Sequence, residues 1–213
     1  MTRLYFVRHG ESVANIQKQF AGSLDVPLTE KGRKQAEATA LYLSAVVFSK
    51  VYASDLLRAF ETGAIIASNG NVPIEKTPLL REIFAGEWEG KTYDQLDAEY
   101  ADSYGVWRHQ IGLAVCPHGE SVAELQRRVQ SFIAEVVKRH VGENVCIATH
   151  ATPIRALECF LTNTPLEKMH TIPWVSNASV TIVEYEEDGH GTIVQRDQHE
   201  HLGALHTVLA KNV

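Results

Sequence analysis

The sequence predicts an α/β fold: a three-layer α/β/α sandwich with a mostly parallel central sheet, an antiparallel edge strand and a small helical cap. Short apolar runs typical of buried strands alternate with amphipathic helical patterns along most of the chain. Two further runs, Val180–Glu184 and Ile193–Arg196, flank a turn at Asp188-Gly189 and predict a hairpin that makes the sheet mixed. Roughly residues 82–120 carry aromatic and charged side chains without strand alternation, which indicates a cap of short helices and loops.

The first half of the chain contains two of the predicted strands and two of the predicted helices. Leu4–Val7 is a short apolar run and predicts the first strand. Apolar residues at helical spacing then predict a helix over residues 29–48. Val51–Ala53 predicts the second strand, and Ser54 or Asp55 is expected to cap the helix that follows it.

The second half repeats this alternation after the cap. Ser121 is expected to open a long helix, because Glu124 three residues later completes a capping box. Asn144–Thr149 reads as a buried strand. Thr152 is expected to cap the next helix, with Pro153 at its first position.

Length and charge limit the classes of protein to which the chain can belong. With 213 residues it has room for one sizeable α/β core, and we expect a single domain over residues 1–213. The formal net charge of −6 argues against nucleic acid or an anionic membrane as partner, because proteins that bind these usually carry a basic surplus. We expect a monomer or a homodimer.

Cysteine usage and the first residues bear on the compartment. Cys116, Cys146 and Cys159 are widely spaced and odd in number, as expected for buried thiols in a reducing environment. The first residues carry Arg3 and Arg8 and lack the long apolar stretch of a signal peptide. We therefore expect a cytoplasmic protein.

Three segments bring cationic or imidazole side chains to the expected carboxyl edge of the sheet, where open α/β sheets bind ligands. The first strand leads into Arg8-His9, and the strand over 144–149 leads into His150. Arg58 and Arg155 are expected in the first turns of helices, where the helix dipole disfavours a cation. A bound phosphate would resolve that conflict, because helix N-termini and guanidinium groups both favour anions. Arg155 has an alternative role as the partner of an acid such as Glu158.

Five ordered blocks of the chain resemble the histidine phosphatase (phosphoglycerate mutase-like) superfamily, and they cover nearly its whole length. The blocks are LYFVRHGES at 4–12, SDLLRAFET at 54–62, LREIFAGEWEGKT at 80–92, PHGES at 117–121 and THATPIRAL at 149–157. The resemblance is to the phosphatase branch, and it implies a phosphoric monoester hydrolase that acts on a small phosphorylated substrate without a metal or other cofactor.

The resemblance also implies roles for individual residues. His9 would be the nucleophile and form a phosphohistidine, with Arg8, Arg58 and His150 around the phosphoryl oxygens. Glu82 would protonate the leaving alcohol and then activate water. The substrate-binding set implied in this way is Arg8, Asn15, Gly22, Arg58, His150 and Ala151. Many relatives carry glycine where Ala151 follows His150 here, but the alanine still offers its backbone N–H to a phosphate.

Several alternatives stay open at this level. On spacing alone the general acid could be Glu82, Glu87, Glu89 or Asp94, and only the resemblance favours Glu82. A cofactor-dependent phosphoglycerate mutase would share the core, although such mutases usually have a longer insertion after the acid. A non-catalytic module that binds a phosphorylated ligand is a third possibility, but binding alone would not need the nucleophile and the acid together.

Two further groups of side chains have a functional and a purely structural interpretation. The aromatic residues of the cap could line the leaving-group side of the pocket or pack the cap onto the sheet; they are Phe84, Trp88, Tyr93 and Trp107. The histidines His199, His201 and His206 lack a strong metal-binding pattern and are expected at a strand end and in the segment after it. The sequence does not distinguish between the two interpretations of the aromatic residues.

Overall fold

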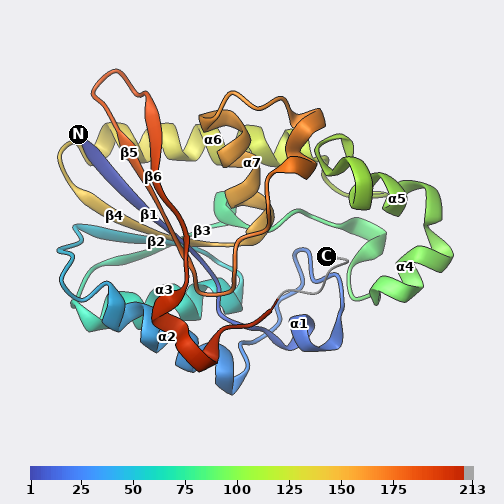
Figure 1. Ribbon diagram of the computed structural model, residues 1–213, viewed down its shortest axis with the longest axis horizontal. Coiled ribbons are helices and arrows are strands. Elements are labelled where there is room, and N and C mark those ends of the chain that lie inside the picture. The colour runs from blue at the N-terminus through green and yellow to red at the C-terminus, as the bar shows by residue number, and fades with distance from the viewer. Residues whose placement is uncertain (209–213) are drawn as a thin grey trace.

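The structure is a computed structural model, and it describes residues 1–208. Within these residues six strands form one mixed sheet in the order β3-β2-β4-β1-β5-β6 (Figure 1). The strands are β1 (Thr2–Arg8), β2 (Lys50–Ser54), β3 (Ile74–Thr77), β4 (Asn144–Thr149), β5 (Val180–Tyr185) and β6 (Gly191–Gln198). The first four are mutually parallel, β5 runs antiparallel to β1, and β6 pairs with β5 to complete the edge. The predicted mixed α/β sheet with a terminal hairpin is therefore confirmed.

Helices cover both faces of the sheet, as Figure 1 shows. They are α1 (Val13–Gln17), α2 (Glu30–Tyr42), α3 (Leu57–Asn69), α4 (Tyr93–Glu99), α5 (Ala101–Gln110), α6 (Val122–Arg139) and α7 (Ala151–Leu161). The pair α2 and α3 packs on one face, and the pair α6 and α7 packs on the other. Helices α4 and α5 extend beyond the sheet and form the cap.

Some element boundaries differ from the predicted ones, and β3 and the short α1 were not predicted. Helix α2 ends at Tyr42, because the chain turns so that Phe48 enters the core and packs edge-on against Tyr5 at a ring-centroid distance of 5.1 Å. Helix α3 is capped by Leu56 rather than by Ser54 or Asp55, since Ser54 is the last residue of β2.

The start of α7 also differs from its prediction. His150 is the N-cap, so Thr152 and Pro153 occupy the second and third helical positions. Proline is tolerated there, because the first four backbone N–H groups of a helix have no partner within the helix. The difference matters for the site, since it moves the helix N-terminus onto His150 itself.

A buried aromatic cluster holds the cap against the loop that follows α1. Trp88 is fully buried, and its ring lies edge-on to Phe20 at 5.5 Å and to Tyr104 at 5.6 Å between centroids. Trp107 is 4.9 Å from Phe20 in the same arrangement. Edge-to-face contacts at these distances are favourable in addition to the burial of apolar area. The cap is therefore positioned relative to residues 18–22 by packing rather than by a flexible linker.

The cysteines and the helices agree with two simpler expectations from composition. Cys116, Cys146 and Cys159 are all buried and unpaired within the described chain. Burial raises the pKa of the Cys146 thiol to about 12, so this sulfur stays protonated near neutral pH. Across residues 1–208 no helix combines the length and the apolar character that a bilayer crossing requires.

The predicted capping box of α6 is present, and its removal provides a test of local stability. Ser121 Oγ accepts from the backbone N–H of Glu124 at 3.2 Å, while Glu124 Oε2 accepts from the N–H of Ser121 at 2.8 Å. We expect Ser121→Ala to lower the free energy of unfolding by about 1 kcal/mol, measured by urea denaturation. Ser131→Ala, at an exposed position of the same helix, should change it by less than about 0.5 kcal/mol. Equal effects of the two substitutions would show that the capping box does not stabilise the fold.

Candidate active site

The carboxyl ends of β1, β2 and β4 meet at one edge of the sheet and deliver the predicted residues there. A small pocket of about 70 Å³ lies at this edge. Its lining residues are Arg8, His9, Ser12, Asn15, Gln19, Phe20, Ala21, Gly22, Arg58, Glu82, Tyr93, Trp107, Ala151, Thr152 and Trp174. All the predicted site residues except His150 are among them, and the His150 ring contacts that of His9.

His9 is held in one tautomer by its own loop. Its backbone N–H donates to the Thr149 carbonyl oxygen at 2.9 Å, which joins the ends of β1 and β4. Its Nδ1 lies 2.7 Å from the Gly10 carbonyl oxygen, and a carbonyl can only accept. Nδ1 therefore carries the proton, and Nε2 keeps a free lone pair. Burial, and then the charges of Arg58 and Arg8, lower the pKa of His9 well below 6.5, so its imidazole is neutral.

His150 is fully buried and stands beside His9, with 5.1 Å between the ring centroids. Its Nε2 lies 2.9 Å from Ser54 Oγ. Ser54 Oγ accepts from the Leu56 N–H at 3.3 Å, so its own hydrogen can point to Nε2 and leave the His150 proton on Nδ1. Nδ1 has no partner in the described chain. A buried donor without a partner is costly, and a ligand oxygen would satisfy it.

The two buried imidazoles predict a pH dependence of stability whose sign can be worked out. Burial lowers the pKa of His150 as it does that of His9, whereas histidines of the unfolded chain take up protons below about pH 6.5. The folded-state pKa values lie below the unfolded ones, so this contribution to stability is full above that pH and is lost as the pH falls. Each histidine accounts for a loss on the order of 1 kcal/mol between about pH 7.5 and 5.5.

We therefore expect wild type to lose on the order of 1 kcal/mol more stability over this interval than His150→Gln. Urea denaturation at the two pH values measures the difference. His109→Gln, at an exposed position of α5, serves as the matched control and should follow wild type. If His150→Gln also follows wild type, then His150 takes up its proton equally in the folded and unfolded states.

Two buried arginines face the pocket without a carboxylate partner. Arg8 Nη1 donates to the Val175 carbonyl oxygen at 2.6 Å, and Arg58 donates to the carbonyl oxygens of Leu24 and Gly22, both at 2.8 Å. Neither guanidinium forms an ion pair within 4.0 Å among the described residues. Burial lowers the pKa of each to about 10, partly offset by the charge of Glu82, so both stay cationic near neutral pH. Buried cations that lack an anion indicate an anionic ligand.

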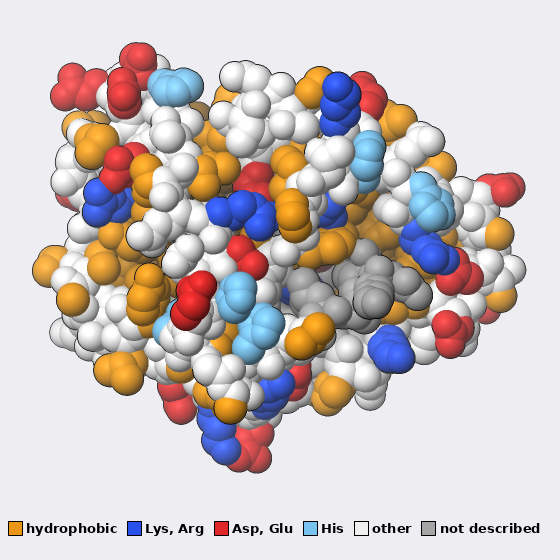
Figure 2. Space-filling view, viewed as in Figure 1, with side chains coloured by type: hydrophobic (Ala, Val, Ile, Leu, Met, Phe, Trp, Pro, Cys, Tyr) orange, Lys and Arg blue, Asp and Glu red, His pale blue; other side chains and the backbone are white. Residues whose placement is uncertain are grey.

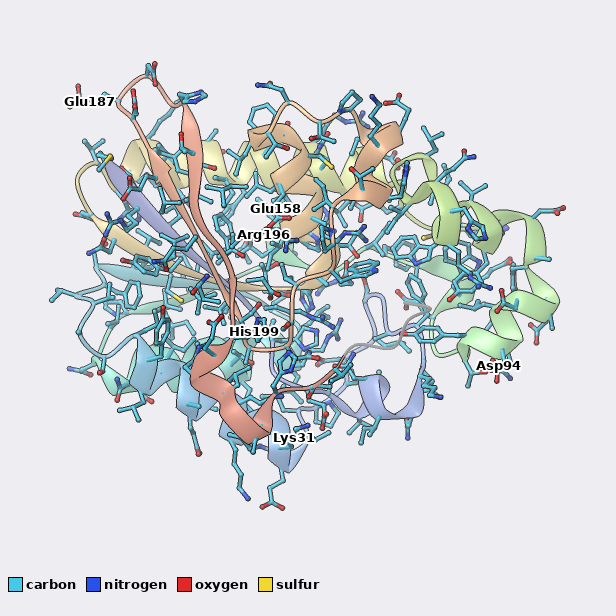
Figure 3. All side chains as sticks on the ribbon, viewed as in Figure 1. Lys31, Asp94, Glu158, Glu187, Arg196 and His199 are labelled. Atoms are coloured by element: carbon cyan, nitrogen blue, oxygen red, sulfur yellow. The ribbon has the colours of Figure 1, made fainter. Side chains whose placement is uncertain are left out.

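Arg155 does not join this pair. It lies beyond the first turn of α7 and is not among the pocket-lining residues, so its predicted place in the positive helix terminus is wrong. Its expected ionic partner is also wrong, since Glu158 Oε2 lies 3.1 Å from Arg196 Nη2 of β6 (Figure 3). Arg155 instead donates to the Met169 carbonyl oxygen at 3.0 Å and stacks its guanidinium 3.8 Å above the Trp174 ring centroid.

Glu82 is the acid that borders the pocket. Its Oε1 accepts from the Ile83 N–H at 2.8 Å, and its Oε2 accepts from the Thr152 N–H in the first turn of α7 at 3.2 Å. Glu89 is occupied elsewhere, with Oε1 accepting from the N–H groups of Ser23 and Ala85. Two other acids, Glu87 and Asp94, are exposed on the cap, and Figure 3 shows Asp94 at its outer side. Its position beside the pocket therefore favours Glu82 as the general acid, as the family resemblance does.

The remaining predicted binding residues border the same pocket. Asn15 Oδ1 accepts from the Ser12 N–H at 3.0 Å and from Asn177 Nδ2 at 3.3 Å, so the Asn15 amide nitrogen remains available to a ligand. Gly22 has φ +50°, and a Cβ there would lie 2.7 Å from the Ala85 Cβ, which explains the glycine. Ala151 lines the pocket and is the first residue of α7, where a backbone N–H has no partner within the helix.

Asn177 is a site residue that the sequence did not indicate. It is fully buried, and its Nδ2 donates to the His9 carbonyl oxygen at 3.1 Å as well as to Asn15. It therefore couples the backbone of His9, the predicted nucleophile, to the orientation of the Asn15 amide. Ser54, which orients His150, was expected only as a helix cap.

The aromatic residues of the cap divide between the two interpretations. Tyr93 and Trp107 line the pocket, whereas Trp88 is buried in the core and Phe84 is half exposed in a separate hollow. Trp174, from the segment before β5, also lines the pocket and was not predicted.

The histidines near the end of β6 lie outside the pocket. The rings of His199 and His206 stack with 4.5 Å between centroids, and His201 Nε2 lies 2.9 Å from Thr39 Oγ1. Pale-blue side chains gather in the lower centre of Figure 2, where Figure 3 labels His199. Residues 1–208 contain no group of three or more His, Cys, Asp or Glu side chains placed to hold a metal ion. These contacts fasten the segment after β6 onto α2.

A larger groove of about 630 Å³ lies at the other end of the strands, between α6, α7 and the β5–β6 turn. Its floor is mainly apolar, and its rim carries Glu186, Glu187 and Asp188. Figure 3 labels Glu187 at the upper left. Among the described residues that line it there is no histidine or arginine. Size alone therefore does not mark the functional site, and the smaller pocket holds the reactive groups.

Comparison with known proteins agrees with this geometry. Residues 4–198 match the family described as the histidine phosphatase superfamily (branch 1). Phosphoserine phosphatase 1 of Hydrogenobacter thermophilus is 33% identical over 187 residues, which are 88% of each chain. Adenosylcobalamin/alpha-ribazole phosphatase of Escherichia coli is 32% identical over 167 residues, 78% of this chain and 82% of that one. The solved structure of Bacillus stearothermophilus YhfR has a TM-score of 0.91 and 33% identity, covering 95% of this chain and 100% of that one.

Proposed function

Because this chain belongs to branch 1 of the histidine phosphatase superfamily and is a phosphatase, we propose that it hydrolyses a small phosphate monoester through a phosphohistidine on His9, without a metal ion. One observation carries the proposal: the neutral His9 has its lone pair on Nε2 and lies among two buried guanidinium groups that lack an anion. A phosphoryl group supplies that anion and is also the electrophile that the lone pair attacks.

The first step transfers the phosphoryl group from substrate to enzyme. A bond forms between His9 Nε2 and phosphorus while the bond from phosphorus to the ester oxygen breaks. The leaving oxygen takes the proton of the Glu82 carboxyl group, which is held at the pocket by the N–H groups of Ile83 and Thr152. Arg8 and Arg58 neutralise the equatorial phosphoryl oxygens, and the unpaired Nδ1–H of His150 can donate to one of them.

The second step returns the phosphoryl group to water. Glu82, now ionised, accepts a proton from a water molecule as the oxygen of that water attacks phosphorus. The bond from phosphorus to His9 Nε2 breaks, inorganic phosphate leaves, and the neutral imidazole is restored. The same carboxyl group serves both steps because the alcohol leaves phosphorus on the side opposite His9, and water attacks from that same side.

The compartment and partners are proposed on simpler grounds. Three buried, unpaired thiols suit the reducing cytoplasm. The net charge of −6 offers no general attraction for nucleic acid or anionic lipid, so the expected partner is a small phosphorylated molecule.

Trapping of the covalent intermediate tests the proposal. Wild type is mixed with a radiolabelled aryl phosphate in EDTA and quenched in alkaline detergent. We expect a label that is stable to alkali, lost in acid and located on the peptide that contains His9. A label on another residue, or turnover that EDTA abolishes, would contradict this route. Transfer between phosphoglycerates that depends on bisphosphoglycerate would indicate a mutase, and binding with neither label nor phosphate release would indicate a binding module.

A further inference from the structure

The residues that line the pocket include two chemically different groups. The charged group consists of Arg8, Arg58 and Glu82, which the proposed mechanism assigns to the phosphoryl group and the ester oxygen. The second group is uncharged and has no part in the proposed chemistry, so it is available to the alcohol part of the substrate; it consists of Gln19, Phe20, Ala21, Tyr93, Trp107 and Trp174. The second group therefore decides which alcohol fits.

Three members of this second group, Tyr93, Trp107 and Trp174, are aromatic and line the pocket, and they are called the aromatic wall here. Trp107 is 5% exposed and packs edge-on against Phe20, so its position is fixed by the core. The Trp174 ring follows at 6.4 Å between centroids and a tilt of 34°. Rings at such spacing and tilt present a nearly continuous apolar surface, against which another flat ring can stack.

The described lining of the pocket offers a substrate no positive charge beyond the two arginines that face the phosphoryl group. Among the described residues that line the pocket, Arg8 and Arg58 are the cations, and both are required by the phosphoryl group. A carboxylate or second phosphate on the alcohol would lose its hydration near the aromatic wall without gaining a partner there.

Arg155 packs against one face of Trp174, which is one ring of the aromatic wall. Its side chain is 3% exposed, and its guanidinium lies 3.8 Å from the Trp174 ring centroid. Since that face is covered, Trp174 borders the pocket with its other face or its edge. A cation on one face draws electron density from the ring, which favours stacking of an electron-rich aromatic group on the opposite face.

We propose that the preferred substrates are phosphate monoesters whose alcohol is planar, aromatic and uncharged, and that this ring stacks on the wall of Tyr93, Trp107 and Trp174. Arg155 is a positioning residue, which acts on the substrate through Trp174. The inference rests on the proposed function only in assuming that the phosphoryl group lies between Arg8 and Arg58.

Binding of non-hydrolysable phosphonates tests the substrate class without requiring turnover. Isothermal titration calorimetry with wild type compares benzylphosphonate, 4-carboxybenzylphosphonate and cyclohexylmethylphosphonate. We expect benzylphosphonate to bind about tenfold more tightly than the carboxylated compound and about fivefold more tightly than the non-planar one. Equal or tighter binding of the carboxylated compound would overturn the inference.

Substitutions in the wall test which residues carry the preference. Trp174→Ala should weaken benzylphosphonate binding about tenfold and leave the Kd of inorganic phosphate within about twofold. Arg155→Met should weaken it about threefold, with partial recovery in Arg155→Lys, which keeps the cation but not the flat stack. Phe160→Ala is the matched control, because Phe160 is a half-exposed aromatic residue of the same helix that faces the distant groove.

The outcomes separate this inference from the proposed function. If Trp174→Ala keeps the full preference for benzylphosphonate, the wall does not recognise the ring and the inference fails. A parallel loss of inorganic phosphate binding in the Arg155 variants would show a general structural role and would overturn the positioning role. If the preference holds but no phosphohistidine forms on His9, the inference stands and the proposed chemistry fails.

Discussion

Replacing His9 with glutamine is expected to lower kcat for an aryl phosphate by at least about 10⁴-fold. Glutamine keeps a polar side chain of similar reach but has no lone pair able to displace an alcohol from phosphorus. The loss falls on kcat because Arg8 and Arg58 remain to bind the phosphoryl group, with their guanidinium groups fixed by neighbouring carbonyl oxygens. Steady-state phosphate release, together with calorimetric binding of inorganic phosphate, measures the two effects separately.

The control for this prediction is His109→Gln, which makes the same chemical change at an exposed position of the cap. It should retain kcat within about twofold. In His9→Gln the Kd of inorganic phosphate should stay within about tenfold of wild type, which shows that the pocket is intact. Substantial turnover in His9→Gln would mean that water attacks the ester directly, and the covalent route would be excluded.

Much of the fold could be predicted because it is encoded locally. The strand over 144–149 is an apolar run of the right length, and the capping box at Ser121 identifies the start of α6 from two residues alone. The strand β3 and the cap of α7 could not be predicted in this way. Ile74–Thr77 alternates weakly and becomes a strand only because β2 pairs with it, and His150 caps α7 because β4 ends there.

The place of a candidate site residue could be predicted where one strand end delivers it directly, as for His9 and His150. Asn177 was missed because it reaches His9 across the sheet, 168 residues along the chain. A topological signal was nevertheless available: β5 runs antiparallel to β1, so the residues just before β5 must lie at the edge where β1 ends. Trp174 belongs to the same approach segment. The predicted position of Arg155 was wrong because helical spacing does not show which residue caps the helix. With His150 rather than Thr152 as the N-cap, Arg155 lies beyond the first turn.

The effect of Glu82→Gln should depend on the leaving group, and this is the sharpest test of its role. The amide of the introduced glutamine cannot protonate an alkoxide, so kcat/KM for an alkyl phosphate should fall about 10³-fold. The same quantity for 4-nitrophenyl phosphate should fall less than about tenfold, because nitrophenolate leaves without a proton. Glu87→Gln, at an exposed acid of the cap, should leave both values within about twofold of wild type.

The second role of Glu82 gives an independent signature in the same variant. With 4-nitrophenyl phosphate, phosphorylation of His9 stays fast, but the water that attacks the phosphohistidine has lost its base. Rapid mixing should therefore show a burst of nitrophenolate equal to the enzyme concentration, followed by turnover about 10²-fold slower than in wild type. The acid-labile label should accumulate on His9 during that slow phase. If both esters lose kcat/KM equally and no burst appears, Glu82 does not transfer the proton in either step. Its contacts with Ile83 and Thr152 would then mean that it serves to hold the start of α7 against the segment before the cap.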